Sequence, residues 1–136
     1  VLATAQSLFS WSNPRVAVEV SGTNDSWRHE GAIVAVAIAN GRQFGGGLVI
    51  APNADPFDGQ LDLTVLGDMR RRDLLRLAPL VFEGGHTRHK SVHTARGHVV
   101  SITGDESVCL EVDGEPVGRL PLRAELTPGA LRIRTP

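Results

Sequence analysis

Arg15-Val16-Ala17-Val18-Glu19-Val20 is the stretch that decides the fold, because valine recurs at every second position. Alternate side chains of a strand share one face of a sheet, so the pattern predicts a strand with one buried face. Turn-forming residues follow at 21–25. Similar apolar runs predict further strands at 32–39, 48–50, 61–67, 99–103, 107–112 and 130–133, with Pro116 and Pro121 confined to edges or loops.

One internal helix is predicted over 69–82, with Asp68 near its N-terminal cap and Gly84-Gly85 ending it. Leu74, Leu77 and Val81 share one of its faces. Four arginines crowd its first two turns: Arg70, Arg71, Arg72 and Arg76. A second helical spacing runs from Val1 to a stop at Asn13-Pro14, so residues 1–13 are predicted to be a connecting helix. Six or seven short strands with one or two helices predict a β-sandwich or an open barrel.

The size and charge of the chain limit the classes of protein to which it can belong. With 136 residues it is predicted to form one domain, residues 1–136. Fourteen basic against 15 acidic residues give a net charge of −1, which argues against bulk binding of nucleic acid. Cys109 is the only cysteine and no apolar run could span a bilayer, so a soluble, cytoplasmic location is expected. The start at Val1 predicts a fragment or a processed chain.

Two acidic bends carry the candidate chemistry. Asp55-Pro56-Phe57-Asp58-Gly59-Gln60-Leu61-Asp62 offers carboxylate and main-chain oxygens of the kind that bind Mg²⁺ or Ca²⁺, but it equally fits a solvated turn whose aspartates bond their own backbone. Asp113-Gly114-Glu115 follows an apolar strand. Its glutamate could accept a proton from a hydroxyl, and the alternative is a plain hairpin turn.

A third group of residues is His86, His89 and His93. Three imidazoles at these spacings could meet one metal ion if the segment were helical. Gly84-Gly85 and the neighbouring cations argue against that, and a basic, partly exposed loop is the simpler expectation.

The order of six motifs resembles the C-terminal domain of the diacylglycerol kinase and sphingosine kinase superfamily of lipid kinases, especially its soluble bacterial members. The resemblance covers residues 14–136. It implies a mainly β, two-layer β-sandwich with one or two helices, following an N-terminal nucleotide-binding domain whose Gly-Gly-Asp-Gly-Thr loop is absent from this chain. The motifs are 40–47, 50–54, 58–62, 83–86, 112–115 and a Pro-Gly-Ala-Leu at 128–131.

The resemblance also implies site residues. Asp58 would give a side-chain oxygen to Mg²⁺, with the main-chain carbonyls of Asp55 and Gln60 beside it. Glu115 would accept the proton of the lipid hydroxyl as that hydroxyl attacks ATP. ATP would be bound mainly by the N-terminal domain, so the 136 residues alone are expected to be inactive. The substrate implied is diacylglycerol or a similar lipid alcohol.

Partners follow from the same resemblance. An anionic membrane surface attracts exposed arginines, so the helix at 69–82 could dock the enzyme peripherally on a bilayer. The alternative is a solvated helix face. A homodimer is a further possible assembly of the chain. The competing functions are a non-catalytic β-sandwich module that binds a cation and a lipid, and a metal-dependent hydrolase using His86, His89 and His93.

Overall fold

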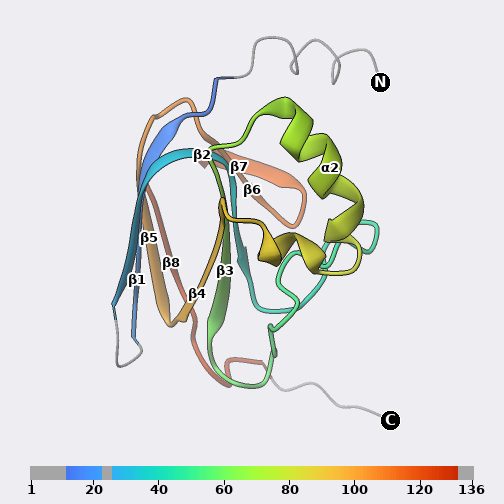
Figure 1. The fold of residues 1–136 in the computed structure, drawn as a ribbon. Coiled ribbons are helices and arrows are strands. Elements are labelled where there is room, and N and C mark those ends of the chain that lie inside the picture. Colours follow the sequence, from blue (N-terminus) through green and yellow to red (C-terminus); the bar gives the residue numbers. More distant parts are fainter. Residues whose placement is uncertain (1–11, 23–25, 132–136) are drawn as a thin grey trace.

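The computed structural model describes residues 12–22 and 26–131 and shows a mainly antiparallel β fold with one α-helix (Figure 1). The mainly β prediction is confirmed. In chain order the elements are β1 (Arg15–Ser21), β2 (Trp27–Ala39), β3 (Leu61–Gly67), α2 (Arg71–Val81), the short 3₁₀ helix η1 (Gly85–Arg88), β4 (Val92–Gly97), β5 (Val99–Gly104), β6 (Cys109–Val112), β7 (Glu115–Arg119) and β8 (Leu122–Glu125).

The long strand β2 joins the two layers. Its first half pairs with β1 and its second half with β3, and its register shifts between Ile33 and Ala35. The six-stranded sheet, in the order β4-β3-β2-β1-β5-β8, therefore folds over so that β1, β5 and β8 face β3 and β4 (Figure 1). A Cβ atom at Gly97 of β4 would lie 2.5 Å from Cγ1 of Val20 in β1, so only glycine lets these layers meet. The predicted two-layer β-sandwich is confirmed.

The core lies between the layers. The alternating valines of β1, Val16, Val18 and Val20, are buried as predicted. They pack with inward residues of the other strands into one cluster that also contains Ile33, Leu61, Leu63, Val65, Val100, Ile102 and Leu120. Because burial of apolar area drives folding, this alternation explains why these segments form strands.

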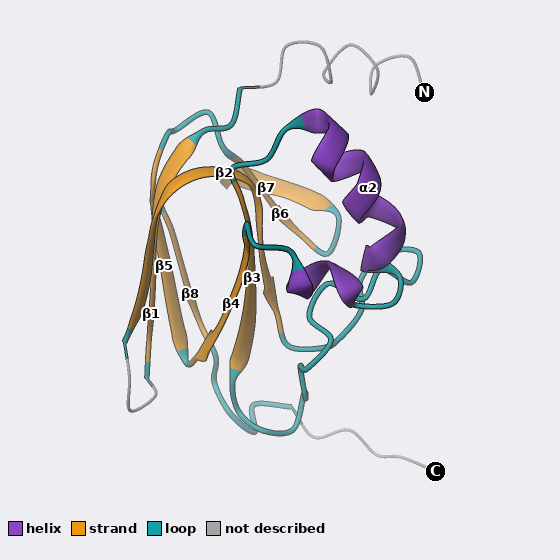
Figure 2. Cartoon of the chain, viewed as in Figure 1, coloured by secondary structure: helices purple, strands orange, loops and turns teal. Residues whose placement is uncertain are grey.

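A layer of loops and helices covers the outer face of β3 (Figure 2). Every residue of β3 from Leu61 to Val65 is buried, which a strand covered on one face would not show. The loop residues Ile50, Ala51 and Ala54 pack against β2 and Val81, while Leu77 of α2 packs with Met69 and Val92. The chain thus places β3 between the sandwich core and this outer layer.

The observed helix is shorter than predicted. It begins at Arg71 with Arg70 as N-cap and no side-chain cap; Asp68 lies two residues before the cap, and its carboxylate accepts a hydrogen bond of 2.6 Å from Asn13 Nδ2. Gly84 follows the helix with φ of 72°, in agreement with the predicted stop. Of the predicted connecting helix 1–13, only Ser12 and Asn13 are described, and neither is helical.

One predicted strand is wrong, another lies partly outside the described residues, and three strands were not predicted. Residues 48–50 form only an isolated bridge between Phe44 and Leu48, because the glycines at 45–47 turn the chain back on itself. Ala130 and Leu131 are not in a strand, and 132–133 lie outside the described residues. The strands that sequence reasoning missed are β4, β7 and β8; β4 occupies part of the predicted basic loop.

The prolines lie where the sequence placed them. Pro116 is in β7, which pairs only with β6, and β8, which follows Pro121, is an edge strand. Among the described residues, no helix is long and apolar enough to cross a membrane.

Candidate functional site: an apolar cavity and two acidic bends

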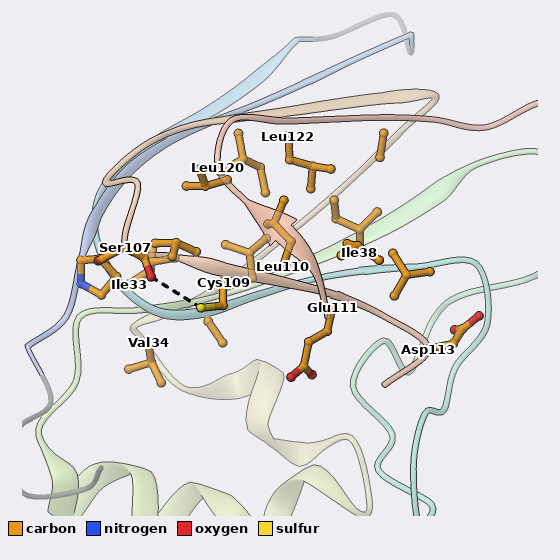
Figure 3. A pocket seen from close by; sticks show the side chains of 18 of the residues that line it. Ile33, Val34, Ile38, Ser107, Cys109, Leu110, Glu111, Asp113, Leu120 and Leu122 are labelled. Carbon is orange, nitrogen blue, oxygen red and sulfur yellow. Dashed lines mark hydrogen bonds between the residues drawn. The ribbon is translucent and has the colours of Figure 1, made fainter. Parts of the chain in front are cut away.

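A cavity of about 770 Å³ opens between the second half of β2, strands β5 and β8, and the β6–β7 hairpin (Figure 3). Its walls are mainly aliphatic. In Figure 3, Leu120 and Leu122 lie on one side and Ile38 and Leu110 across from them. The main apolar lining residues are Ile33, Val34, Val36, Ile38, Ile102, Val108, Leu110, Val117, Leu120, Leu122 and Ala124.

Much of this lining consists of aliphatic side chains that border the hydrophobic core but are not fully covered by it. Val36, Ile38, Val108 and Leu110 pack against the buried cluster, yet each is only half-buried. Interiors are normally close-packed, so aliphatic side chains that border an open space mark a place where an apolar ligand can replace water. The volume lies in the range of small-molecule sites, about 300–1,000 Å³. The cavity can therefore take hydrocarbon.

The mouth of the cavity carries carboxylates. Glu111 and Asp113 line it together with Val112. Asp113 has φ of 51° and Gly114 φ of 88°, so these two residues form the tight turn between β6 and β7. The structure thus confirms a hairpin turn at Asp113-Gly114.

Glu115 follows the turn and is not among the residues that line the cavity. It is the first residue of β7, it is exposed, and it pairs across the hairpin with the lining residue Val112. The next residue but one, Val117, also lines the cavity. The hairpin turn does not exclude a catalytic carboxylate at Glu115, because its two neighbours in the hairpin, Val112 and Val117, both line the cavity.

The other acidic bend, residues 55–62, is held by its own side chains. The Asp55 carboxylate accepts a hydrogen bond from the Phe57 N–H at 3.0 Å, and Asp58 Oδ1 accepts one from the Gln60 N–H at 2.9 Å. The Asp58 N–H donates to the Asp55 carbonyl at 3.3 Å. These are the self-bonded turns that the sequence left as an alternative to a cation site.

Arg96 of β4 joins this bend to the sheet. Its guanidinium donates to Asp58 Oδ2, and its Nε lies 3.2 Å from Asp62 Oδ1. Asp62 is 6% exposed and its Oδ2 is buried without a hydrogen-bond partner. Burial raises the pKa of Asp62, an effect that Arg96 opposes and Asp58 reinforces. Sequence reasoning missed Arg96 because it was assigned to a loop.

The oxygens of this bend fit a hard divalent cation in kind. Asp58 offers a carboxylate, Asp55 and Gln60 offer main-chain carbonyls, and Asp62 Oδ2 is buried in the same bend without a hydrogen-bond partner. Arg96 supplies the positive charge in the structure described here. A cation at Asp58 would therefore share the carboxylate with Arg96 or displace it.

The three predicted histidines do not converge. His86 is fully buried and its Nε2 lies 3.1 Å from the Ile50 carbonyl, while His89 Nδ1 accepts a hydrogen bond from the Ser91 N–H. His93 packs on His29, with ring centroids 4.9 Å apart. Within the described part of the chain, no three histidine, cysteine or acidic side chains are grouped to hold a metal. The metal-dependent hydrolase therefore has no support.

The cavity had no signal in the sequence. Its lining runs from Ser12 to Ala124 and comes from segments that only the folded sheet brings together. Of its two acidic lining residues, Asp113 belongs to the bend that the sequence singled out, whereas Glu111 was not a candidate. A strand pattern shows which residues face inward, but not whether the facing residues leave a space.

Fold and cavity together define an antiparallel β-sandwich domain with an internal apolar site. The chain belongs to the YegS C-terminal NAD kinase beta sandwich-like domain family, whose model matches residues 1–135. It is 38% identical over 97 residues to a diacylglycerol kinase of Mycobacterium tuberculosis, a match that covers 71% of this chain and 31% of that protein. It is 33% identical over 136 residues to a "Probable lipid kinase YegS-like" of Xanthomonas euvesicatoria, covering 99% of this chain and 43% of that protein.

A solved structure shares the fold. A diacylglycerol kinase from Bacillus anthracis str. Sterne superposes with a TM-score of 0.61 at 20% identity, covering 93% of this chain and 43% of the other. The chain spans less than half the length of the curated relatives that it matches. The predicted kinship with lipid kinases is confirmed at the level of the family.

Proposed function

We propose that this domain forms the lipid-binding half of an ATP-dependent lipid kinase that phosphorylates diacylglycerol or a similar lipid alcohol. The observation that carries the proposal is the cavity of about 770 Å³ with aliphatic walls and a carboxylate-bearing mouth. A lipid alcohol has the matching chemistry, because its chains are apolar and its hydroxyl is polar and uncharged. The names of the relatives support the same class.

The chemistry is assigned to the rim. With the chains of the lipid in the cavity, its hydroxyl lies at the mouth beside the β6–β7 hairpin. Glu115 accepts the hydroxyl proton, the oxygen bonds to the γ-phosphorus of ATP, and the bond to the β-phosphate oxygen breaks to release ADP. The nucleotide is held mainly by a partner domain opposite the hairpin, because phosphoryl transfer depends on aligning both substrates.

Mg²⁺ is assigned to the bend at Asp58, with the carbonyls of Asp55 and Gln60. Bound there, it supplies a fixed positive charge that orders the bend and supports the fold. Because a ligand that binds only the native state stabilises it, Asp58→Ala should lower thermal stability more in Mg²⁺ than in chelator. Equal loss in both conditions would remove the ion from this bend.

The experiment that tests the proposed function is transfer of radiolabelled phosphate from ATP to a panel of lipid alcohols, using the protein at its native length. Transfer to diacylglycerol or another long-chain alcohol is expected. Glu115→Gln should remove most of this transfer and leave the fold intact, whereas Glu125→Gln, also an exposed strand glutamate but paired with Arg123, should retain it. No transfer to any lipid, with lipid still bound, would favour the non-catalytic module.

A further inference from the structure

The outward face of α2 is unusually apolar. Leu74, Leu77 and Val81 turn toward the fold, as Leu77 at 4% exposure shows. On the opposite side Leu75 is 77% exposed and Phe82, which continues the helical conformation, is 55% exposed. The spacing of 75, 79 and 82 places Leu75, Pro79 and Phe82 along one line of the helix. We call these three residues the outer ridge.

Arginines flank the outer ridge. Arg70, Arg72 and Arg76 are exposed and lie in or beside the first two turns. The acidic residue among them, Asp73, is 3.9 Å from Arg72 and is partly buried. The chain as a whole has a net charge of −1, so this positive charge is local to the helix.

The loop beside α2 extends the apolar surface. The Val49 N–H donates to the Val81 carbonyl at 2.9 Å, which holds the Phe44–Leu48 turn near the C-terminal end of the helix. Phe44 there is 54% exposed. Large apolar side chains gathered on one surface mark an interaction site more often than scattered ones do.

We propose that the outer ridge inserts into the interfacial region of an anionic bilayer while Arg72 and Arg76 contact lipid phosphates. A helix with exposed leucine and phenylalanine between arginines has the composition of helices that lie in the membrane plane. A nucleic acid could use the arginines, but it would leave Leu75 in water. This inference rests on the proposed function and deepens it, because it names the surface that would hold the enzyme on the membrane that contains its lipid substrate.

One residue lies between the cavity and the helix layer. Val34 of β2 packs against the buried cluster of Met69, Leu77 and Val92, and it also lines the cavity. In Figure 3, Val34 lies on the side of the cavity that faces the helical segment. A bilayer on the outer ridge therefore lies across α2 from the cavity wall at Val34.

The test measures binding of the native-length protein to vesicles of neutral phosphatidylcholine, with or without about one third phosphatidylglycerol. Binding is expected only with the anionic lipid. Arg72→Gln with Arg76→Gln should weaken it about 25-fold, because each basic residue at the surface adds about fivefold. Leu75→Ser with Phe82→Ser should weaken it at least about tenfold.

Matched controls separate this surface from net charge. Arg28→Gln with Arg123→Gln removes the same charge from exposed arginines of the sandwich, and Leu131→Ser removes an exposed leucine outside α2. Both should bind like the wild type. Wild-type protein that ignores anionic vesicles, or α2 variants that bind as well as the controls, would overturn the proposal.

A second measurement reports where the ridge lies. In a Cys109→Ser background, a polarity-sensitive fluorophore on Leu75→Cys should react readily in solution and shift to the blue on anionic vesicles. A site that cannot be labelled without vesicles would mean that another part of the native protein covers the ridge, which refutes membrane docking. The α2 variants should phosphorylate a short-chain, water-soluble lipid alcohol as fast as the wild type does. If the wild type itself does not phosphorylate this substrate, the proposed function is contradicted, and not the membrane docking.

Discussion

Lowering the pH should reduce the free energy of unfolding through protonation linked to His86. The substitution His86→Leu should remove this part of the pH dependence. The imidazole is fully buried, and its burial lowers the pKa of His86 below its usual value near 6.5. In the unfolded chain the same group titrates normally. Below about pH 6.5 the unfolded state therefore binds a proton that the folded state excludes, so stability falls with pH.

The magnitude follows from this linkage. Between about pH 7.5 and about pH 5.5, one histidine that stays neutral in the fold costs at most about 1.4 kcal/mol of unfolding free energy. At the higher pH, His86→Leu loses one hydrogen bond to Ile50, worth about 1 kcal/mol. It also removes the buried Nδ1 that has no partner, and Thr64 Oγ1 still donates to the same carbonyl at 2.9 Å. At the higher pH, the lost hydrogen bond and the removal of the unpartnered Nδ1 therefore nearly cancel in the free energy of unfolding.

Urea unfolding of the 136-residue chain, followed by circular dichroism at both pH values, measures this difference. The wild type should lose up to about 1.4 kcal/mol more than His86→Leu on acidification. Burial and His93 also lower the pKa of His29, which adds the same loss to both proteins and cancels in the comparison. His98→Gln, at an exposed histidine, should behave like the wild type. Equal losses in the wild type and His86→Leu would refute the assignment of His86 as neutral.

Three further predictions test other parts of the structure. Gly104→Ala should destabilise the chain by more than about 2 kcal/mol in thermal unfolding, because its φ is 141° and a Cβ would lie 2.4 Å from the Arg15 carbonyl; Gly41→Ala, with open space around it, should be near neutral. Arg96→Gln should cost about 1–3 kcal/mol in chelator and show a larger stabilisation by Mg²⁺ than the wild type, and an unchanged response to Mg²⁺ would contradict the shared carboxylate. Leu110→Trp should fill part of the cavity and lower kcat/KM for long-chain lipid alcohols about tenfold more than for short-chain ones, which a chain-length series checks.

The alternating segments of the sandwich could be predicted from the sequence because each buries one face. Val16, Val18 and Val20 gave that pattern plainly, and so did Leu61, Leu63 and Val65. The first half of β2 does not show this alternation, because Trp27, His29 and Gly31 occupy its inward positions. Histidine counts as a polar residue, so the pattern does not predict a buried face there.

Tertiary contacts explain the remaining failures. β4 carries only two aliphatic residues, Val92 in the outer cluster and Ala95 toward the sandwich core, so its strand depends on pairing with β3. Asp68 is a good helix cap by residue type, but its bond to Asn13 draws it away from the helix. The link between Arg96 and the acidic bend spans 38 residues, and no local pattern could report it.

The same sheet serves two sides of the domain, and this arrangement links the proposed site to the proposed docking helix. The inner face of β2 supplies Ile38 and Val36 to the cavity, while Val34, next to the bulge at Ile33 and Ala35, lines the cavity and packs against the cluster that contains Leu77 of α2. A regular strand would turn alternate residues to opposite faces. Because the register shifts here, consecutive residues 33–36 all line the cavity, and one of them is also in contact with the helix layer. Truncating Val34 should therefore disturb lipid selectivity and the seating of α2 together, whereas truncating Ile38, which touches the cavity but not the helix cluster, should disturb selectivity alone.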